Sequence, residues 1–219
     1  MARTGGQISQ SEHNQHRLQR ALSWFERSEK ARADEEKFIF LWISFNASYG
    51  SEPTGMDEDQ LTENRKIRNF LHEIIKRDAH QKIGTILLEK HSEPLRVFLE
   101  NPYVFRLFWR WARDPSSAYN WRKRFESNRD RIQNALEQKN AHTVFFEVFK
   151  RLYELRNQVF HGGVAFAKGW GHTQLRNGTN IMADVVPVIL DIMKADIEAN
   201  PDSEIWGKVA YPRVGDNPD

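Results

Sequence analysis

The chain contains no cysteine and no apolar run that approaches the ~18–20 residues of a membrane-spanning helix. Disulfides, thiol catalysis and zinc sites built on thiolates are therefore excluded. The first ten residues, MARTGGQISQ, lack the apolar segment of a signal peptide. The sequence also lacks an HExxH motif, a phosphate-binding glycine loop and a convincing Ser-His-Asp arrangement, and its histidines form no metal-ligand cluster. We expect a soluble, cytoplasmic protein that needs no metal and no cofactor.

Aromatic residues are abundant, with 14 Phe and 7 Trp among 219 residues. Each buried aromatic removes a large area from water, so the chain can build a core and is not expected to be disordered throughout. The length suits one domain. We expect a disordered N-terminal tail over residues 1–11, a single helical domain over 12–199 and a polar C-terminal tail over 200–219. Within that last tail, Ile205, Trp206 and Tyr211 could pack back on the domain.

Apolar residues recur at helical spacing along most of the chain, and no segment alternates as a strand does. The pattern predicts an all-α fold, an antiparallel bundle. Its predicted helices cover 14–31, 34–49, 60–77, two short stretches within 80–100, one from Pro102, 117–139, 142–160 and 181–199. We expect residues 162–180, which hold five glycines, to be a loop, and Pro187 either to kink the last helix or to mark its start. Phe105, Phe108, Trp109 and Ala112 are expected to face inward. Asn46 is expected to be buried, and His13 to lie in a frayed helix start.

One stretch concentrates chemistry-bearing side chains, the LYELRNQVFHGG of residues 152–163. Arg156, Asn157 and His161 fall within six residues at the predicted end of a helix. The Arg–His spacing alone is weak, because a looser form of it also matches Arg65 and His72. The context adds information. Asn157 follows the arginine directly, Asn157 and His161 share a helix face, and a glycine pair leaves the backbone open to a phosphate.

This stretch resembles the Arg-x(4–6)-His signature of the HEPN superfamily, with Arg156, Asn157 and His161 in the arginine, polar and histidine positions. The segment FLWISFNASYG at 40–50 is similar to the buried second helix of larger bacterial members. The resemblance implies a HEPN-like antiparallel helical bundle with extra helices inserted between about 80 and 140. It also implies a homodimer with a composite active site, and it suggests a toxin or anti-phage effector with an antitoxin-like protein partner.

Many members of that family are, or resemble, metal-independent endoribonucleases, and others are inactive RNA-binding or scaffolding modules. The residues suit the chemistry. Arg156 can pair with phosphate oxygens, His161 can act as acid or base, and Asn157 can orient His161. The alternative is an arginine and a histidine that interact with the helix dipole and its last carbonyls, in a non-catalytic module that binds RNA or a protein.

A second candidate region is basic and aromatic, the FRLFWRWARDPSSAYNWRKRF of residues 105–125. Arginines neutralise phosphates and aromatics stack on bases, so this composition favours single-stranded RNA. The predicted RNA-binding residues are Arg106, Arg110, Arg113, Trp121, Arg122, Lys123 and Arg124. The alternative is a pair of amphipathic helices whose aromatics belong to the core and whose charges form a solvated face.

Overall fold

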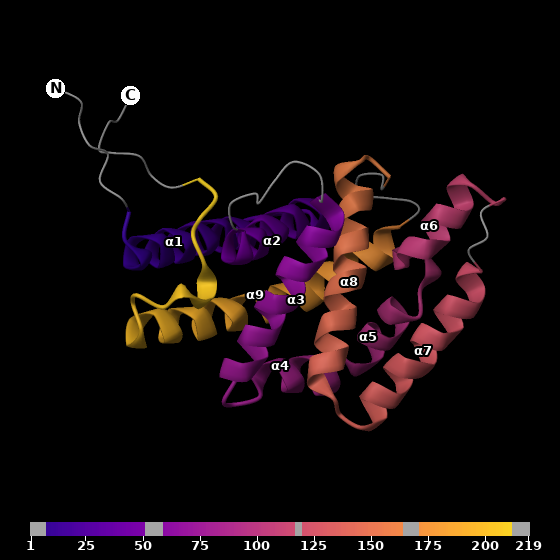
Figure 1. Ribbon diagram of the computed structural model, residues 1–219. Coiled ribbons are helices and arrows are strands. Elements are labelled where there is room, and N and C mark those ends of the chain that lie inside the picture. The colour runs from indigo at the N-terminus through magenta and orange to yellow at the C-terminus, as the bar shows by residue number, and fades with distance from the viewer. Residues whose placement is uncertain (1–7, 51–58, 117–119, 164–170, 212–219) are drawn as a thin grey trace.

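The computed structural model describes residues 8–50, 59–116, 120–163 and 171–211, with the backbone alone at 59–62. Every regular element in these ranges is helical, which confirms the all-α prediction (Figure 1). The elements are α1 (Gln10–Glu29), α2 (Asp34–Tyr49), α3 (Asp59–Arg77), α4 (Lys82–Thr85), the π-helical turn η1 (Ile86–Lys90), α5 (Ser92–Leu99), the 3₁₀ turn η2 (Pro102–Val104), α6 (Arg106–Arg113), α7 (Trp121–Glu137), α8 (Ala141–Phe160), α9 (His172–Ala199) and the 3₁₀ turn η3 (Glu204–Trp206). None of these helices is long and apolar enough to cross a membrane.

Helices α1 and α2 pack against each other and against α9 on one side of the molecule (Figure 1). The α1 helix begins with a capping box, in which Ser9 and Glu12 exchange side-chain and backbone hydrogen bonds. It therefore starts inside the range expected to be a tail, of which residues 1–7 lie outside the described part. His13, expected in a frayed start, is only 6 % exposed.

The α8 helix runs through the middle of the fold, where it packs against α3, α7 and α9 (Figure 1). Val148, Leu152 and Leu155 are fully buried, as their spacing predicts. Aromatic rings join α8 to α2, and the rings of Phe45 and Phe149 lie 4.4 Å apart. The burial of such rings removes large apolar areas from water and so compensates for the low aliphatic content of the chain.

The prediction of a loop over 162–180 is wrong for its second half, because α9 begins at His172. Residues 164–170 lie outside the described part of the chain. The helix passes close to α8 at Gly178, where a Cβ atom would lie 2.8 Å from Leu155 Cδ2 and 3.1 Å from Leu152 Cδ2. The glycine that suggested a loop is thus a close-packing position inside a helix. Pro187 also lies within α9.

The chain after α9 returns to the domain through Trp206, which is 5 % exposed. Its indole Nε1 donates to Asp196 Oδ2 at 2.9 Å, and its ring lies 5.8 Å from that of Phe70. Ile205 and Tyr211 are instead 48 % and 79 % exposed. Of the three residues considered for this role, only Trp206 therefore packs its side chain on the domain, although the Tyr211 carbonyl accepts from Arg20. Residues 212–219 lie outside the described part.

Helices α6 and α7 lie side by side at the far side of α8 from α1 (Figure 1). Of the four residues expected to face inward, Phe105, just before α6, is buried. The expectation is wrong for α6 itself, none of whose residues is buried: Phe108 and Trp109 are half-buried and Ala112 is exposed. The rings of Phe108 and Trp109 instead form a surface aromatic cluster that joins α6 to Trp121 of α7.

Candidate active site and basic groove

The last turn of α8 fixes the backbone of His161. Gly162 has φ +70°, Gly162 N–H donates to Val159 O, and Gly163 N–H donates to Gln158 O at 2.7 Å. These bonds form a Schellman motif, which ends a helix at a residue with a left-handed backbone conformation. Glycine adopts this conformation more easily than any other residue. The glycine pair therefore terminates α8 and leaves the His161 side chain exposed at its end. A Cβ on Gly162 would meet no described atom within 4 Å, so the space beside the turn is open.

Arg156 lies one turn before this end and is half-buried. Its NH1 donates to Asn157 Oδ1 at 3.0 Å, and its guanidinium carbon lies 4.6 Å from the centre of the Phe160 ring. Among the described residues it forms no ion pair with a carboxylate, and its buried Nε has no hydrogen-bond partner. A guanidinium held by an aromatic face and an amide keeps donors available for an anion.

The side chain of Asn157 accepts from Arg156, and the bond that joins it to His161 runs through its backbone carbonyl. The structure thus gives Asn157 a direct role in holding the arginine. Its predicted role in orienting the imidazole stays a prediction.

A polar cluster from α2 and α3 lies near Arg156. The Tyr49 hydroxyl is 3.0 Å from Asn46 Oδ1 and 2.5 Å from Glu63 Oε1. Burial raises the pKa of Tyr49 well above its ordinary value and Glu63 adds to the increase, whereas Arg156 opposes it. Asn46 is exposed rather than buried, so the expectation for this residue is wrong. Its contact with Tyr49 still makes it part of this polar cluster.

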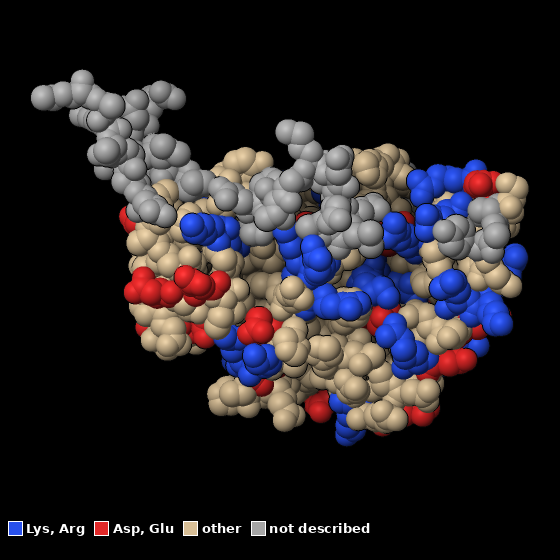
Figure 2. Space-filling model, in the orientation of Figure 1, with Lys and Arg blue, Asp and Glu red and all other residues tan. Residues whose placement is uncertain are grey.

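A groove of about 1020 Å³ runs between α3, α7 and α8, and residues of η2 and α6 also line it. Arg65 and Arg68 of α3 line it, as does Arg106 of α6. Lys123, Arg124 and Arg131 of α7 and Lys150 and Arg151 of α8 complete a set of eight cations, against one carboxylate, Glu154. Figure 2 shows Lys and Arg gathered across the face where α8 passes between α3 and α7.

Three residues of the groove lining bond to a buried carboxylate, Glu147, which is 0 % exposed. Glu147 accepts from Arg131, from Lys150 at 3.1 Å and from Asn128 Nδ2 at 3.0 Å. Asn128 Oδ1 in turn accepts from Arg151 at 2.7 Å. Burial raises the pKa of Glu147, but Lys150, Asn128 and Arg131 outweigh burial and hold it below its ordinary value. One carboxylate therefore positions three of the groove's cations, directly or through an amide.

Arg151 is 2 % exposed, and burial lowers its pKa to about 10. It therefore remains protonated at neutral pH and adds a positive charge beneath the groove. Burial also raises the pKa of Glu154, although Arg106, Arg113 and Arg151 oppose this increase. The single carboxylate of the lining is thus less acidic than an ordinary glutamate.

The structure divides the seven predicted RNA-binding residues. Arg106, Lys123 and Arg124 line the groove. The other four lie outside its lining. Arg113 donates to Trp109 O, and Arg122 stacks over the Trp111 and Trp121 rings at 5.3 Å and 5.0 Å. Arg110 is exposed, and Trp121 is part of the aromatic cluster.

Five cations of the groove are not among the predicted RNA-binding residues: Arg65, Arg68, Arg131, Lys150 and Arg151. Arg65 and Arg68 are spaced for one helix face, but nothing in the sequence shows what that face meets. Lys150 and Arg151 offered a clearer signal, because two adjacent cations interrupt the apolar pattern of the helix predicted over 142–160.

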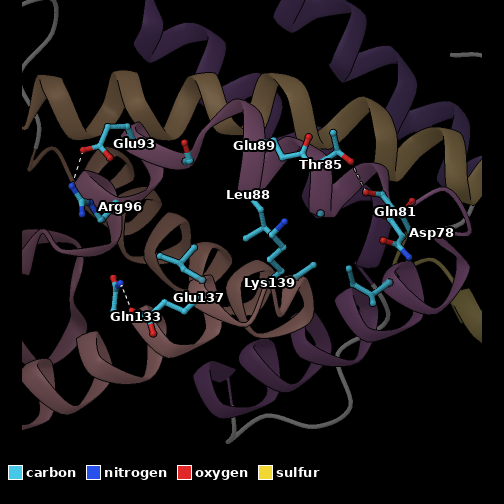
Figure 3. Close-up of a pocket in the computed structure, with 15 residues that line it drawn as sticks. Asp78, Gln81, Thr85, Leu88, Glu89, Glu93, Arg96, Gln133, Glu137 and Lys139 are labelled. Carbon is cyan, nitrogen blue, oxygen red and sulfur yellow. Dashed lines mark hydrogen bonds and ion pairs between the residues drawn. The ribbon is translucent and has the colours of Figure 1, made fainter.

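A second cavity of about 690 Å³ lies between α4, η1, α5 and the end of α7 (Figure 3). Several of its polar side chains bond to one another or to nearby backbone: Arg96 to Glu93, Gln133 to Glu137, and Thr85 to the Gln81 carbonyl. It adjoins Ala141, at the opposite end of α8 from His161, about 30 Å away along the helix. In the described residues no group of three or more His, Asp or Glu could hold a metal ion.

Comparisons of the chain with protein-family models, with curated proteins and with solved structures found no match. The inference of function therefore depends on the geometry of the site.

Proposed function

We propose that the protein is a metal-independent endoribonuclease of the HEPN type. The observation that supports it best is the end of α8. There Arg156, with no carboxylate partner among the described residues, and the exposed His161 follow within two helical turns of Glu154, which lines a groove of eight cations. A cationic track beside an arginine and a histidine provides the two requirements of RNA cleavage without a metal, namely charge stabilisation and proton transfer.

In this mechanism the 2′-oxygen of one nucleotide attacks the adjacent phosphorus and the bond from phosphorus to the 5′-oxygen breaks. A base removes the proton of the 2′-hydroxyl, and an acid protonates the leaving 5′-oxygen, so that a 2′,3′-cyclic phosphate remains. His161 performs one of these transfers, because imidazole exchanges protons near neutral pH. Arg156 stabilises the charge that develops on the phosphate oxygens, and Asn157 holds Arg156 in place.

The motif supplies only one histidine per chain, which is few for two proton transfers, so we propose a homodimer that joins two copies of the motif in one cleft. His161 and the neighbouring Phe160, which is 45 % exposed, lie at a surface where a second copy can reach them. A role as a toxin or anti-phage effector, with an antitoxin-like partner, is supported only by the resemblance of the motif.

The second candidate is a non-catalytic module that binds RNA. The arrangement of Asn157 favours it, because this amide bonds to Arg156, and no described side chain is seen to orient the His161 imidazole. Binding alone would use the groove and leave His161 idle.

Incubation of a mixed RNA pool with the purified protein in EDTA separates the two functions. We expect cleavage that leaves 2′,3′-cyclic phosphate ends and that falls about 100-fold or more in His161→Ala and in Arg156→Ala. His72→Ala is the matched control, since His72 is an exposed histidine of α3 outside the motif. Equal cleavage by His161→Ala and the wild type contradicts the mechanism, and a strictly monomeric mass in light scattering contradicts the shared cleft.

A further inference from the structure

The groove lining carries far more positive than negative side chains. Eight cations face one another across a lining with a single carboxylate, and like charges at short range destabilise a folded chain. Arg65, Arg106, Lys123 and Arg124 form no ion pair within the described part of the chain. A solvated helix face usually intersperses charges of both signs. Four cations without an ion pair among the described residues, all in one groove, indicate a polyanionic ligand.

The groove is preorganised for such a ligand. Glu147 is fully buried and holds Arg131 and Lys150, and Asn128 connects it to Arg151. Glu147 and Asn128 already hold these cations in place, so the cations lose little conformational freedom when an anion binds in the groove. A surface patch of unanchored lysines would not show this arrangement.

Aromatic side chains lie among the cations. Phe146 and the half-buried Tyr153 line the groove, and the Arg68 guanidinium lies 4.6 Å from the centre of the Phe146 ring. Cationic tracks interleaved with aromatic rings are typical of sites that bind single-stranded nucleic acid, where phosphates pair with cations and unpaired bases stack. The volume of about 1020 Å³ also exceeds most sites for a single small molecule.

The groove also points toward the motif. Lys150, Glu154, Asn157 and His161 follow one another at intervals of four, three and four residues, which places them on one face of α8 and its end. The stripe extends about 16 Å along the helix. Lys150 and Glu154 line the groove, so its α8 wall continues directly to His161.

We infer that this groove binds the backbone of a single-stranded RNA segment and directs it along α8 to Arg156 and His161. The choice of RNA rests on the proposed function, whereas the binding itself requires no catalysis. The helices expected as insertions, α6 and α7, then supply one wall of the substrate site.

The test measures binding apart from cleavage. The probe is a fluorescein-labelled single-stranded RNA of about 20 nucleotides with 2′-O-methyl groups, which lacks the attacking hydroxyl, and fluorescence anisotropy is recorded over a range of salt concentrations. The variant is Lys123→Gln/Arg124→Gln. Its matched control is Arg129→Gln/Lys139→Gln, which removes the same charge from exposed positions in and just after α7, outside the groove lining. Thermal unfolding establishes that both variants are folded.

We expect the groove variant to lower the slope of log Kd against log salt by about 1.4, at about 0.7 per phosphate contact, and to weaken binding about 25-fold at 0.1 M salt. The control should change binding less than about twofold. Equal weakening by the two variants, unchanged binding by the groove variant, or tighter binding of the duplex form of the probe overturns the inference.

The outcomes also separate this inference from the proposed function. His161→Ala should bind the 2′-O-methyl probe like the wild type. If the protein binds this probe through the groove but cleaves no RNA, the inference stands and the nuclease function fails. If His161-dependent cleavage occurs while the groove variant binds normally, the function stands and the inference fails.

Discussion

Replacement of Glu147 by glutamine tests the support of the groove. Glu147 is fully buried and accepts hydrogen bonds from Arg131, Lys150 and Asn128. Glutamine has nearly the same volume, so the change removes the charge without creating a cavity. It leaves two cations facing each other above an uncharged amide.

The expected loss of stability follows from these contacts. Breaking a buried ion pair costs about 3–5 kcal/mol when the remaining charge stays buried. Here the side chains of Arg131 and Lys150 are 52 % and 39 % exposed, so both can return to water and the cost is smaller. We expect Glu147→Gln to lower the free energy of unfolding by about 2 kcal/mol at neutral pH, and Tm by about 4–8 °C.

The pH dependence of this loss provides a stricter test. The folded-state pKa of Glu147 lies below its ordinary value. Its charge therefore stabilises the fold fully above the unfolded-state pKa of about 4.3, and this contribution disappears as the pH falls through the folded-state pKa. Urea unfolding should show a constant difference between wild type and Glu147→Gln above about pH 5.5, which shrinks in more acidic solution.

Glu126→Gln is the control, since Glu126 is an exposed glutamate of α7 and its loss should change stability by less than about 0.5 kcal/mol. If Glu147→Gln is as stable as this control, or if its deficit grows as the pH falls, the carboxylate does not hold the groove's cations.

Three further changes have defined outcomes. Gly178→Ala places a Cβ 2.8 Å from Leu155 Cδ2, so overpacking of about 1–3 kcal/mol should exceed the ~1 kcal/mol gained in helix propensity and give a net loss in urea unfolding. Trp206→Ala removes a buried ring and its bond to Asp196, and calorimetry should show a loss of about 3–4 kcal/mol. Glu154→Gln removes the lining's only carboxylate and should tighten RNA binding about fivefold at neutral pH and 0.1 M salt. Because burial raises the pKa of Glu154, wild-type binding should also tighten as the pH falls toward about 5, and the variant should lack this part of the pH dependence in anisotropy titrations.

The parts of the fold that local chemistry determines were predictable. The helix expected over 34–49 begins and ends at those residues, because acidic side chains open it and Gly50 follows its apolar stripe. The helix expected over 142–160 is α8, whose start differs by one residue. In both cases the apolar face is continuous and the ends carry their own signals.

The start of α9 shows where local reasoning fails. Asn177, Gly178 and Asn180 have low helix propensity, and their composition is typical of a loop. Packing against α8 outweighs that preference, and it requires the absence of a side chain at Gly178. A glycine that separates two helices and one that brings them together look the same in a sequence, so only the tertiary contact distinguishes them.

The candidate site divides in the same way. Arg156 and His161 belong to one local stretch, and their chemistry can be proposed from spacing and from the glycines that end α8. The groove combines α3, α6, α7 and α8, so its cations come together only after folding. Three of them, Arg106, Lys123 and Arg124, were visible as a basic cluster, whereas Arg65 and Arg68 depend on a helix distant in sequence.

One helix carries both the groove wall and the motif, and this determines how defects can be interpreted. Val148, Leu152 and Leu155 anchor α8 in the core, so the distance from Lys150 to His161 is set by helical geometry rather than by a loop. A change on the solvent-facing stripe therefore alters charge without altering that distance, and a change in the core shifts both regions together. Loss of binding without loss of stability consequently points to the groove, and loss of cleavage with intact binding points to Arg156 or His161.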